Sequence, residues 1–282
     1  MSLTHAVVAV ALNAVAAVGA RRRDAVTTGG AVAGFLVGAG ILAAGGWVAW
    51  ILLMTFFGSS SVLSRFGTDA KKPLDAIHEK GERRDHVQVL ANGGLGLLLS
   101  IAYAVTNLPG FLIGVAVSFA AANADTWASE IGVLSRRTPV SIISGRPIPR
   151  GTSGGVTLLG FAASAAGAAV IAAVFVAGRT FQLGWTPRAT GVFALVFAGG
   201  VLGAVIDSIL GATVQAQYRD RARGIATERS RSARAGVRGG AAAGEERNTL
   251  IRGWAAVTND VVNAASSLLS TAVAALLYAL AL

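Results

Sequence analysis

Apolar residues occur in long runs along this chain, separated by short polar stretches that are rich in arginine. A helix that crosses the hydrocarbon core of a bilayer needs about 20 mainly apolar residues. Runs of about this length cover 3–20, 87–107, 109–134, 156–177, 190–214 and 254–282. A longer run, 28–57, contains Gly45-Gly46, and we expect it to form a hairpin of two short segments. The pattern predicts an all-α, polytopic integral membrane protein, with seven or eight transmembrane segments in one domain over 1–282.

The composition supports a membrane protein and excludes several other classes. Of the 282 residues, 54% are hydrophobic and 13% are charged, whereas soluble domains average about 25% charged residues. The chain has no cysteine, which excludes a disulfide framework and thiolate metal sites. The net charge is +10, but the aromatic residues do not interleave with the arginines as nucleic-acid binding requires. We therefore expect no nucleic-acid partner.

The positive charges predict the orientation in the membrane. All 24 lysines and arginines except Arg179 and Arg188 fall in four segments, namely 21–27, 58–86, 135–155 and 215–253. Because positive loops stay inside, we expect these segments to be cytoplasmic in a multi-pass protein of the cell membrane. Segment 58–86 is expected to be an amphiphilic loop, and 215–253 a flexible basic insert attracted to anionic membrane lipids.

Acidic residues gather at the inner ends of three predicted spans. The first end carries Asp125 and Glu130 with Asn123 and Ser129, the second Asp207 and Ser208, and the third Asn259, Asp260 and Asn263. A carboxylate within a span is costly and suggests a function. The alternatives are a solvated helix end, a buried structural aspartate and a polar seam between helices, respectively.

One shared site explains three aspartates at the same depth better than three coincidences. Carboxylate oxygens without cysteine or paired histidines are hard ligands that suit Mg²⁺ rather than Zn²⁺. We therefore predict a magnesium site formed by Asp125, Asp207 and Asp260, with Glu130 as a ligand or an orienting group.

The loop 135–155 has the composition of a phosphate-binding loop. Arg146 and Arg150 can donate to phosphate oxygens, and glycines allow close approach of the backbone. The predicted binding stretch is Gly151, Thr152, Ser153, Gly154 and Gly155. Thr152 or Ser153 could also cap the next helix. An ordinary basic loop is the alternative, but beside three carboxylates a nucleotide phosphate site explains the stretch better.

Other polar side chains could add phosphate donors at the same depth. Ser59, Ser60 and Arg65 follow the run 28–57, and Asn92 lies one turn after Gln88. For the first three, an equally good interpretation is a helix end with a snorkelling cation.

Three motifs together resemble the transmembrane-protein-19 family, which includes plant phytyl-phosphate kinase. They are Gln88-Val-Leu-Ala-Asn92-Gly-Gly, Asn123-Ala-Asp125-Thr-Trp-Ala-Ser-Glu130-Ile-Gly and Arg146-Pro-x-Pro-Arg150-Gly-Thr-Ser-Gly-Gly155. The resemblance covers nearly the whole chain and departs from the family at the insert 219–247 and in the last span. It implies phosphoryl transfer from a nucleoside triphosphate, expected to be CTP, to an isoprenyl monophosphate.

The acceptor in such a reaction already carries a phosphate, so no strong general base is needed. Small residues between the spans would leave a groove for the prenyl chain. The alternatives within enzymes are a prenol kinase and a lipid cytidylyltransferase. The alternative from another class is a transporter or channel for an anionic lipid or ion. The position of the carboxylates argues against this alternative, because they gather at one face of the membrane instead of near the midplane.

Overall fold

The computed structural model describes residues 3–67, 71, 77, 83–221, 223–233 and 245–281. The chain is an all-α polytopic membrane protein, as the sequence predicted. Seven helices in the described part are long and apolar enough to cross a membrane. The helices are α1 (Leu3–Arg22), α2 (Thr28–Arg65), α4 (His86–Thr106), α5 (Pro109–Gly132), α6 (Leu158–Leu183), α7 (Arg188–Thr213) and α8 (Asn259–Ala281).

Helix α2 folds back on itself, which confirms the predicted hairpin. A straight helix of its 38 residues would be roughly 57 Å long. Instead, Gly46 leaves the helical conformation with φ of 74°, which glycine tolerates because it has no Cβ. A Cβ on Gly38 would lie 3.7 Å from Leu53, and the Arg65 guanidinium donates to the carbonyl of Arg23, just before α2. Both ends of α2 therefore lie at the same end of the bundle, giving eight segments.

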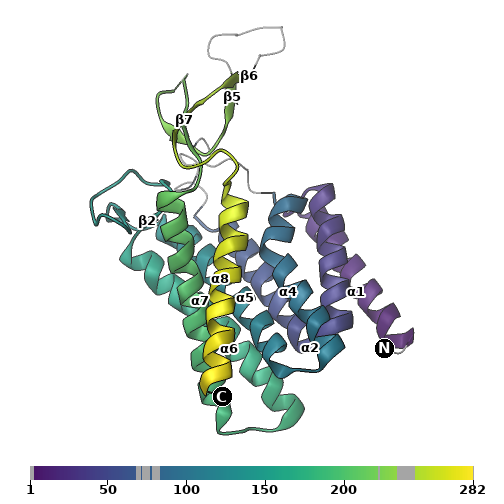
Figure 1. The fold of residues 1–282 in the computed structure, drawn as a ribbon. Coiled ribbons are helices and arrows are strands. Elements are labelled where there is room, and N and C mark those ends of the chain that lie inside the picture. Colours follow the sequence, from purple (N-terminus) through teal and green to yellow (C-terminus); the bar gives the residue numbers. More distant parts are fainter. Residues whose placement is uncertain are drawn as a thin grey trace.

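The helices run side by side, and the longer connections gather at one end (Figure 1). We call this end, where 23–27, 133–157, 214–221, 223–233 and 245–258 lie, the polar end. Both termini lie toward the opposite end (Figure 1). Consecutive segments cross the bundle in opposite directions, and α2 provides two of the eight segments. An even number of segments places both termini at the same end.

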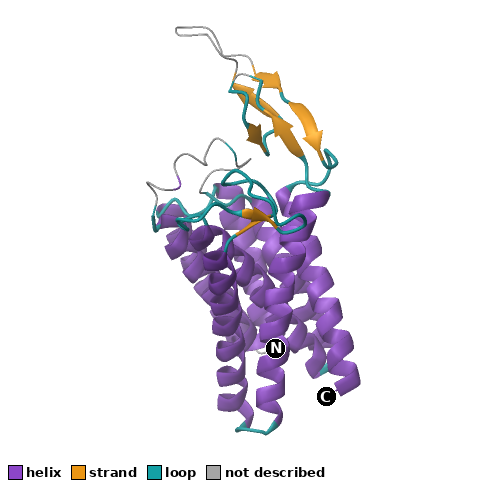
Figure 2. Cartoon of the chain, turned by 90° about the vertical axis from the view of Figure 1, so that its left-hand side faces the viewer, coloured by secondary structure: helices purple, strands orange, loops and turns teal. Residues whose placement is uncertain are grey.

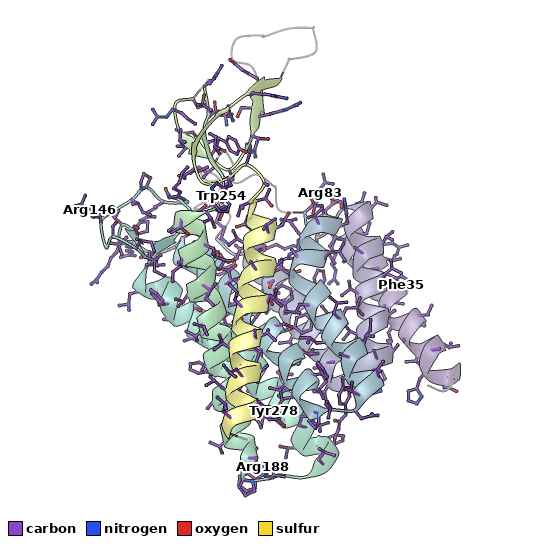
Figure 3. The ribbon with its side chains drawn as sticks, in the orientation of Figure 1. Phe35, Arg83, Arg146, Arg188, Trp254 and Tyr278 are labelled. Atoms are coloured by element: carbon purple, nitrogen blue, oxygen red, sulfur yellow. The ribbon has the colours of Figure 1, made fainter. Side chains whose placement is uncertain are left out.

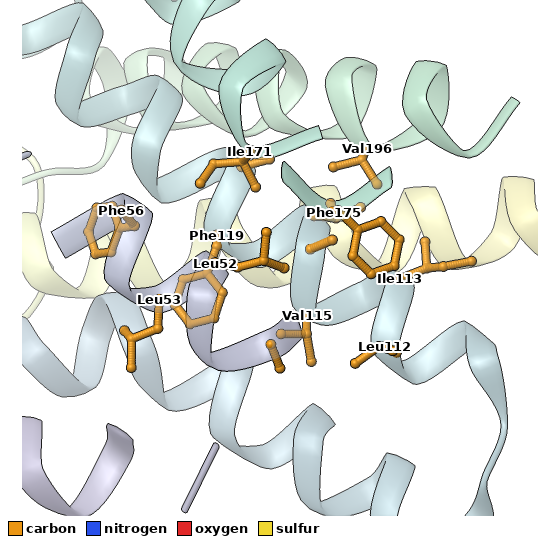
Figure 4. Packing of buried hydrophobic residues seen from close by; sticks show 14 of the residues in the cluster. Leu52, Leu53, Phe56, Leu112, Ile113, Val115, Phe119, Ile171, Phe175 and Val196 are labelled. Atoms are coloured by element: carbon orange, nitrogen blue, oxygen red, sulfur yellow. The ribbon is translucent and has the colours of Figure 1, made fainter. Parts of the chain in front are cut away.

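Helix α5 occupies the centre of the bundle. Its most apolar window is 72% buried, against 11% to 44% in the other helices. Phe119 of α5 stacks on Phe56 at a ring distance of 6.2 Å, and Val115 lies in the same cluster as Ile171 and Phe175 of α6 (Figure 4). This core fills the half of the bundle away from the polar end and holds α5 in place.

Within the described residues, short strands form in the connections at the polar end (Figure 2). β1 (Val140–Ser141) pairs with β2 (Gly155–Val156). β3 (Gln217–Arg219) lies between β4 (Ala226–Thr227) and β7 (Thr249–Arg252) in a sheet of antiparallel pairs. β5 (Arg231–Ala233) pairs with β6 (Glu245–Arg247).

These strands correct one prediction. The segment 215–253 was expected to be a flexible insert because of its low-complexity composition, yet its described part is folded into strands. Local composition did not reveal the strand pairing, which joins segments separated by the length of the insert. Residues 222 and 234–244 of the predicted insert lie outside the described residues, as do 68–70, 72–76 and 78–82 of the predicted amphiphilic loop.

Candidate functional site

A polar cavity of about 440 Å³ opens at the polar end of the bundle. Its lining comes from the end of α2, from α4 to α8 and from the loops that connect them. It brings together most of the side chains that the sequence singled out, namely Asn92, Asp125, Ser129, Glu130, Arg150, Gly151, Thr152, Ser153, Gly154, Gly155, Asp207, Ser208, Asn259, Asp260 and Asn263. Segments that are far apart along the chain therefore converge on one cavity.

Asp125 and Asp207 form an acidic pair deep in this cavity. Each lies six or seven residues inside its helix end, which is about 9 to 10 Å of helix rise. Their carboxyl groups are within hydrogen-bonding reach of each other. Ser266 of α8 donates to Asp207 Oδ2 at 3.2 Å. Two carboxylates this close repel each other, and a cation held between them would relieve the repulsion.

Asp260 lines the same cavity from the first turn of α8 and is 6% exposed. The sequence predicted that it would join Asp125 and Asp207 in one magnesium site. Within the described residues, however, no three acidic or histidine side chains lie close enough to hold a metal ion by themselves. The depth along the helices was predicted well, but the rotation and tilt of α8, which decide the carboxylate distances, come from packing.

Glu130 is engaged with cations rather than with the aspartate pair. Lys71 Nζ lies 2.5 Å from Glu130 Oε2, and Ser64 Oγ donates to Oε1 at 2.8 Å. Burial lowers the pKa of the Arg84 guanidinium, and the negative charge of Glu130 acts in the opposite direction. Glu130 therefore positions Lys71 at the cavity, and of its two predicted roles, ligand or orienting group, the geometry favours the second.

Backbone contacts hold Arg84 and the start of α4 in place. The Arg84 carbonyl accepts from the amide of Thr27, and its amide donates to Ala25. Asp85 then caps α4 by accepting from the Gln88 amide, while Gln88 Oε1 accepts from the Asp85 amide. This capping box orients the first turns of α4, whose residues Gln88 and Asn92 line the cavity.

The stretch 151–155 packs directly on the end of α7. Gly151 and Gly154 have φ of 78° and 83°, a region that strongly favours glycine. A Cβ on Gly154 would collide with Ala212 of α7. Arg252 of β7 donates to the carbonyls of Ser153 at 3.2 Å and Gly211 at 2.8 Å. The folded insert therefore fastens this loop to α7, at the mouth of the cavity.

The cap of α6 differs from the prediction. Thr157, rather than Thr152 or Ser153, accepts from the Gly160 amide at 3.0 Å. The β1–β2 pairing extends the chain through Gly155 and Val156, so α6 begins two residues later than the hydrophobic pattern suggested.

The insert also contributes a carboxylate to the cavity. Glu228 Oε1 accepts from Ser153 Oγ at 2.9 Å and from Gln215 Nε2 at 2.8 Å. Its charge also acts on Asp207. The sequence pattern predicted no role in the site for this insert, because nothing local indicates that residues beside β4 return to the bundle.

Five other predicted residues do not line the cavity. Asn123 and Ser59 bond to each other at 2.9 Å below it, and Asn123 also donates to the Gly167 carbonyl. Ser60 is fully buried. Arg65 turns toward Arg23, and Arg146 lies at the outer edge of the loop carrying β1, away from the helix ends (Figure 3). These positions correct the predicted phosphate-binding set, because helix rotation and loop path decide which polar groups reach the cavity.

Several lining residues were missed as site candidates. They are Lys71, Arg84, Arg137, Ser164, Gln215 and Glu228. Arg84 had one available signal, since it directly precedes the capping residue Asp85 and so had to lie at the helix entrance. The others had no local signal.

The charges of the lining are arranged in depth. The described lining contains the acids Asp125, Glu130, Asp207, Glu228 and Asp260 and the cations Lys71, Arg84, Arg137 and Arg150. Asp125 and Asp207 lie deep, whereas Arg137 and Arg150 are exposed at the rim. Such an arrangement can hold a divalent cation at depth and anionic oxygens between this cation and the arginines.

Similar proteins agree with a membrane assignment. The family described as "Integral membrane protein DUF92" matches residues 11–271. Protein PGR of Arabidopsis thaliana is 33% identical over 228 residues, which are 73% of this chain and 78% of that protein. A membrane protein of Methanocaldococcus jannaschii is 35% identical over 57% of this chain and 63% of its own length. One from Synechocystis is 27% identical over 65% of this chain and 70% of its own. No solved structure matches the chain. The chain belongs to the DUF92 family of integral membrane proteins.

Proposed function

We propose that this protein is a Mg²⁺-dependent prenyl-phosphate kinase whose active site faces the cytoplasm. It would transfer the γ-phosphoryl group of a nucleoside triphosphate, which we expect to be CTP, to an isoprenyl monophosphate. The observation that carries the proposal is the convergence of the Asp125–Asp207 pair, the 151–155 loop and Lys71 and Arg84 on one cavity. The motif resemblance to phytyl-phosphate kinase supplies the substrate classes, and the positive polar end supplies the orientation.

The residues present fit a magnesium ion. In phosphoryl-transfer sites Mg²⁺ is usually bound by one or two carboxylates together with phosphate oxygens and waters. Asp125 and Asp207 are two such carboxylates, and no third ligand from the protein is required. When bound, the ion would neutralise charge on the transferring phosphoryl group.

The chain's own residues would position the two phosphates. Arg150 and the 151–155 loop bind the triphosphate, with the amides of Thr152 and Gly155 already engaged by backbone carbonyls, and Lys71 and Arg84 draw the acceptor phosphate to the opposite side of the cavity. An oxygen of the acceptor phosphate attacks the γ-phosphorus, and the bond from this phosphorus to the β,γ-bridging oxygen breaks. The products are a prenyl diphosphate and a nucleoside diphosphate. The attacking oxygen is already anionic, so no residue has to remove a proton.

Product analysis with labelled CTP distinguishes this proposal from the two alternative enzyme activities, a prenol kinase and a lipid cytidylyltransferase. Purified protein in lipid nanodiscs is incubated with Mg²⁺, CTP labelled at the α- or the γ-phosphate, and either a prenyl monophosphate or the matching free prenol. We expect the γ-label in a prenyl diphosphate. The α-label in the lipid product would instead show a cytidylyltransferase, and the γ-label on a free prenol acceptor would show a prenol kinase.

A flux assay tests the remaining alternative. Liposomes that contain the protein should show no movement of anionic lipid or ions across the bilayer without nucleotide. Flux that is independent of nucleotide would support a transporter or channel and contradict the kinase proposal.

A further inference from the structure

Two buried polar atoms that line the cavity lack partners. Ser164 of α6 is 2% exposed, and its Oγ has no hydrogen-bond partner among the described residues. The same is true of Asn263 Oδ1 of α8. A buried polar atom without a partner is unfavourable and is rare in native structures. Since both residues line the cavity, they indicate that a polar group of a ligand binds there.

Ser164 lies on a stripe of α6 that faces a stripe of α7. The α6 stripe consists of Phe161, Ser164 and Ala168, and the α7 stripe of Gly200, Ala204, Ser208 and Ala212, at the three- and four-residue spacing of one helix face. The stripes meet deep in the bundle, where Ala124, Ala168 and Ala204 form one buried cluster. A Cβ on Gly200 would lie 2.9 Å from the Cβ of Ala168. The two helices are therefore in tight contact below the cavity.

Nearer the polar end, residues of both helices line the cavity. The loop residue Gly154 contacts Ala212, which closes the upper edge. Between this contact and the alanine cluster, Phe161, Ser164 and Ser208 line the cavity. We call this part of the cavity wall, bounded by Ala204 and Ala212, the α6–α7 window. Eight residues of helix rise make it about 12 Å high.

Phe161 is a partly exposed aromatic residue in the cavity wall. It lines the cavity, yet 41% of its surface is exposed on a helix that spans the membrane. It lies in the first turn of α6, which begins at Leu158, so it sits at the level where lipid headgroups meet hydrocarbon. The cavity wall therefore includes an exposed aromatic side chain at the level where the bundle meets the lipid headgroups.

We infer that the α6–α7 window is the entry and binding subsite for the single isoprenoid chain of the acceptor. This inference rests on the proposed function. A prenyl phosphate in the bilayer keeps its phosphate at the interface and its chain in hydrocarbon. Through the window, the phosphate passes Ser164 and reaches Lys71 and Arg84 across the cavity, while the chain passes Phe161 and stays in an apolar environment. No apolar surface then has to enter water.

Photo-crosslinking tests the window without catalysis. The photoreactive residue p-benzoylphenylalanine is introduced by Phe161→p-benzoylphenylalanine or, as the matched control, by Phe181→p-benzoylphenylalanine. Phe181 lies on the same helix at the opposite end and is 93% exposed. With alkyne-tagged geranylgeranyl monophosphate and no nucleotide, we expect a strong adduct at 161 that excess unlabelled geranylgeranyl monophosphate removes. Equal labelling at both positions, or equal labelling by tagged phosphatidylcholine, would reduce the window to ordinary lipid contact and overturn the inference.

Chain-length dependence gives a second measurement. Phe161→Trp narrows the window and should raise the KM for geranylgeranyl monophosphate several-fold, with little change for dimethylallyl monophosphate, whose chain is too short to need it. Phe181→Trp should change neither. An unchanged KM for both acceptors in Phe161→Trp would reject the window and leave the kinase proposal standing. Conversely, the protein could form an adduct at position 161 that unlabelled geranylgeranyl monophosphate removes, yet transfer no phosphoryl group. This result would support the window and reject the kinase proposal.

Discussion

The two halves of the helix bundle use small residues in opposite ways. In the half away from the polar end, a Cβ on Gly199 would lie 2.8 Å from Val117, and one on Gly200 would lie 2.8 Å from Ala120. There the small residues let neighbouring side chains fill the space, because van der Waals packing holds helices together in lipid. In the polar half, Ala204 and Ser208 on the same face of α7 border a cavity. Small residues at regular spacing along α7 therefore border a packed core in one half of the bundle and a cavity in the other. The two halves differ in the polar residues on the neighbouring helices.

The largest effect is expected from the acidic pair. Asp125→Ala should lower the rate of phosphoryl transfer by about 100-fold or more. It removes one of the two carboxylates that would hold the Mg²⁺ ion, which stabilises the negative charge of the transition state. The folded protein should remain, since the cavity is already open there. Turnover in nanodiscs and thermal unfolding in detergent measure the two effects.

Asp24→Asn is the matched control for this change. Asp24 lies at the polar end outside the cavity, is paired with Arg21, and has φ of 54°, which asparagine also tolerates. Normal turnover in Asp125→Ala would remove Asp125 from the mechanism.

Filling the packed half should affect stability instead. Gly200→Leu puts a side chain where Ala120 and Ala168 leave no room, and overpacking costs about 1 to 3 kcal/mol or more. We expect a clear fall in the thermal unfolding midpoint. Gly34→Leu is the control, since a Cβ there meets no atom within 4 Å. Equal midpoints for the two variants would contradict the packing difference between the halves.

Two arginines of one loop should differ in their effect on binding. Arg150 lines the cavity, whereas Arg146 is exposed outside it (Figure 3). Arg150→Ala should raise the KM for nucleotide or acceptor about tenfold, as expected for the loss of one charge-assisted contact to phosphate. Arg146→Ala should leave both constants near those of the unchanged protein. The same shift in both variants would indicate a general effect of surface charge.

The smallest effect is expected at the insert. Glu228→Gln keeps an oxygen that accepts from Ser153 and Gln215 but removes a negative charge near the proposed triphosphate site. We expect the KM for nucleotide to fall by about twofold to fivefold, the range for a weak charge interaction, and more at low salt. A loss of turnover as large as that of Asp125→Ala would make Glu228 part of the metal site.

The sequence by itself determined the class of the protein, its spans and the depth of its acids. Apolar runs must become helices in a bilayer, because every backbone polar group needs an internal partner there. Asp125 and Asp207 stood out for the same reason, since carboxylates rarely occur within spans.

Only the tertiary structure decided which polar groups share the cavity. Arg65 and Lys71 come from one connection, yet Lys71 reaches Glu130 while Arg65 turns to Arg23. Likewise, Glu228 reaches Ser153 from a segment whose composition suggested a flexible insert. The rotation of a helix and the path of a loop depend on contacts between residues far apart in the chain, and no local pattern encodes these contacts.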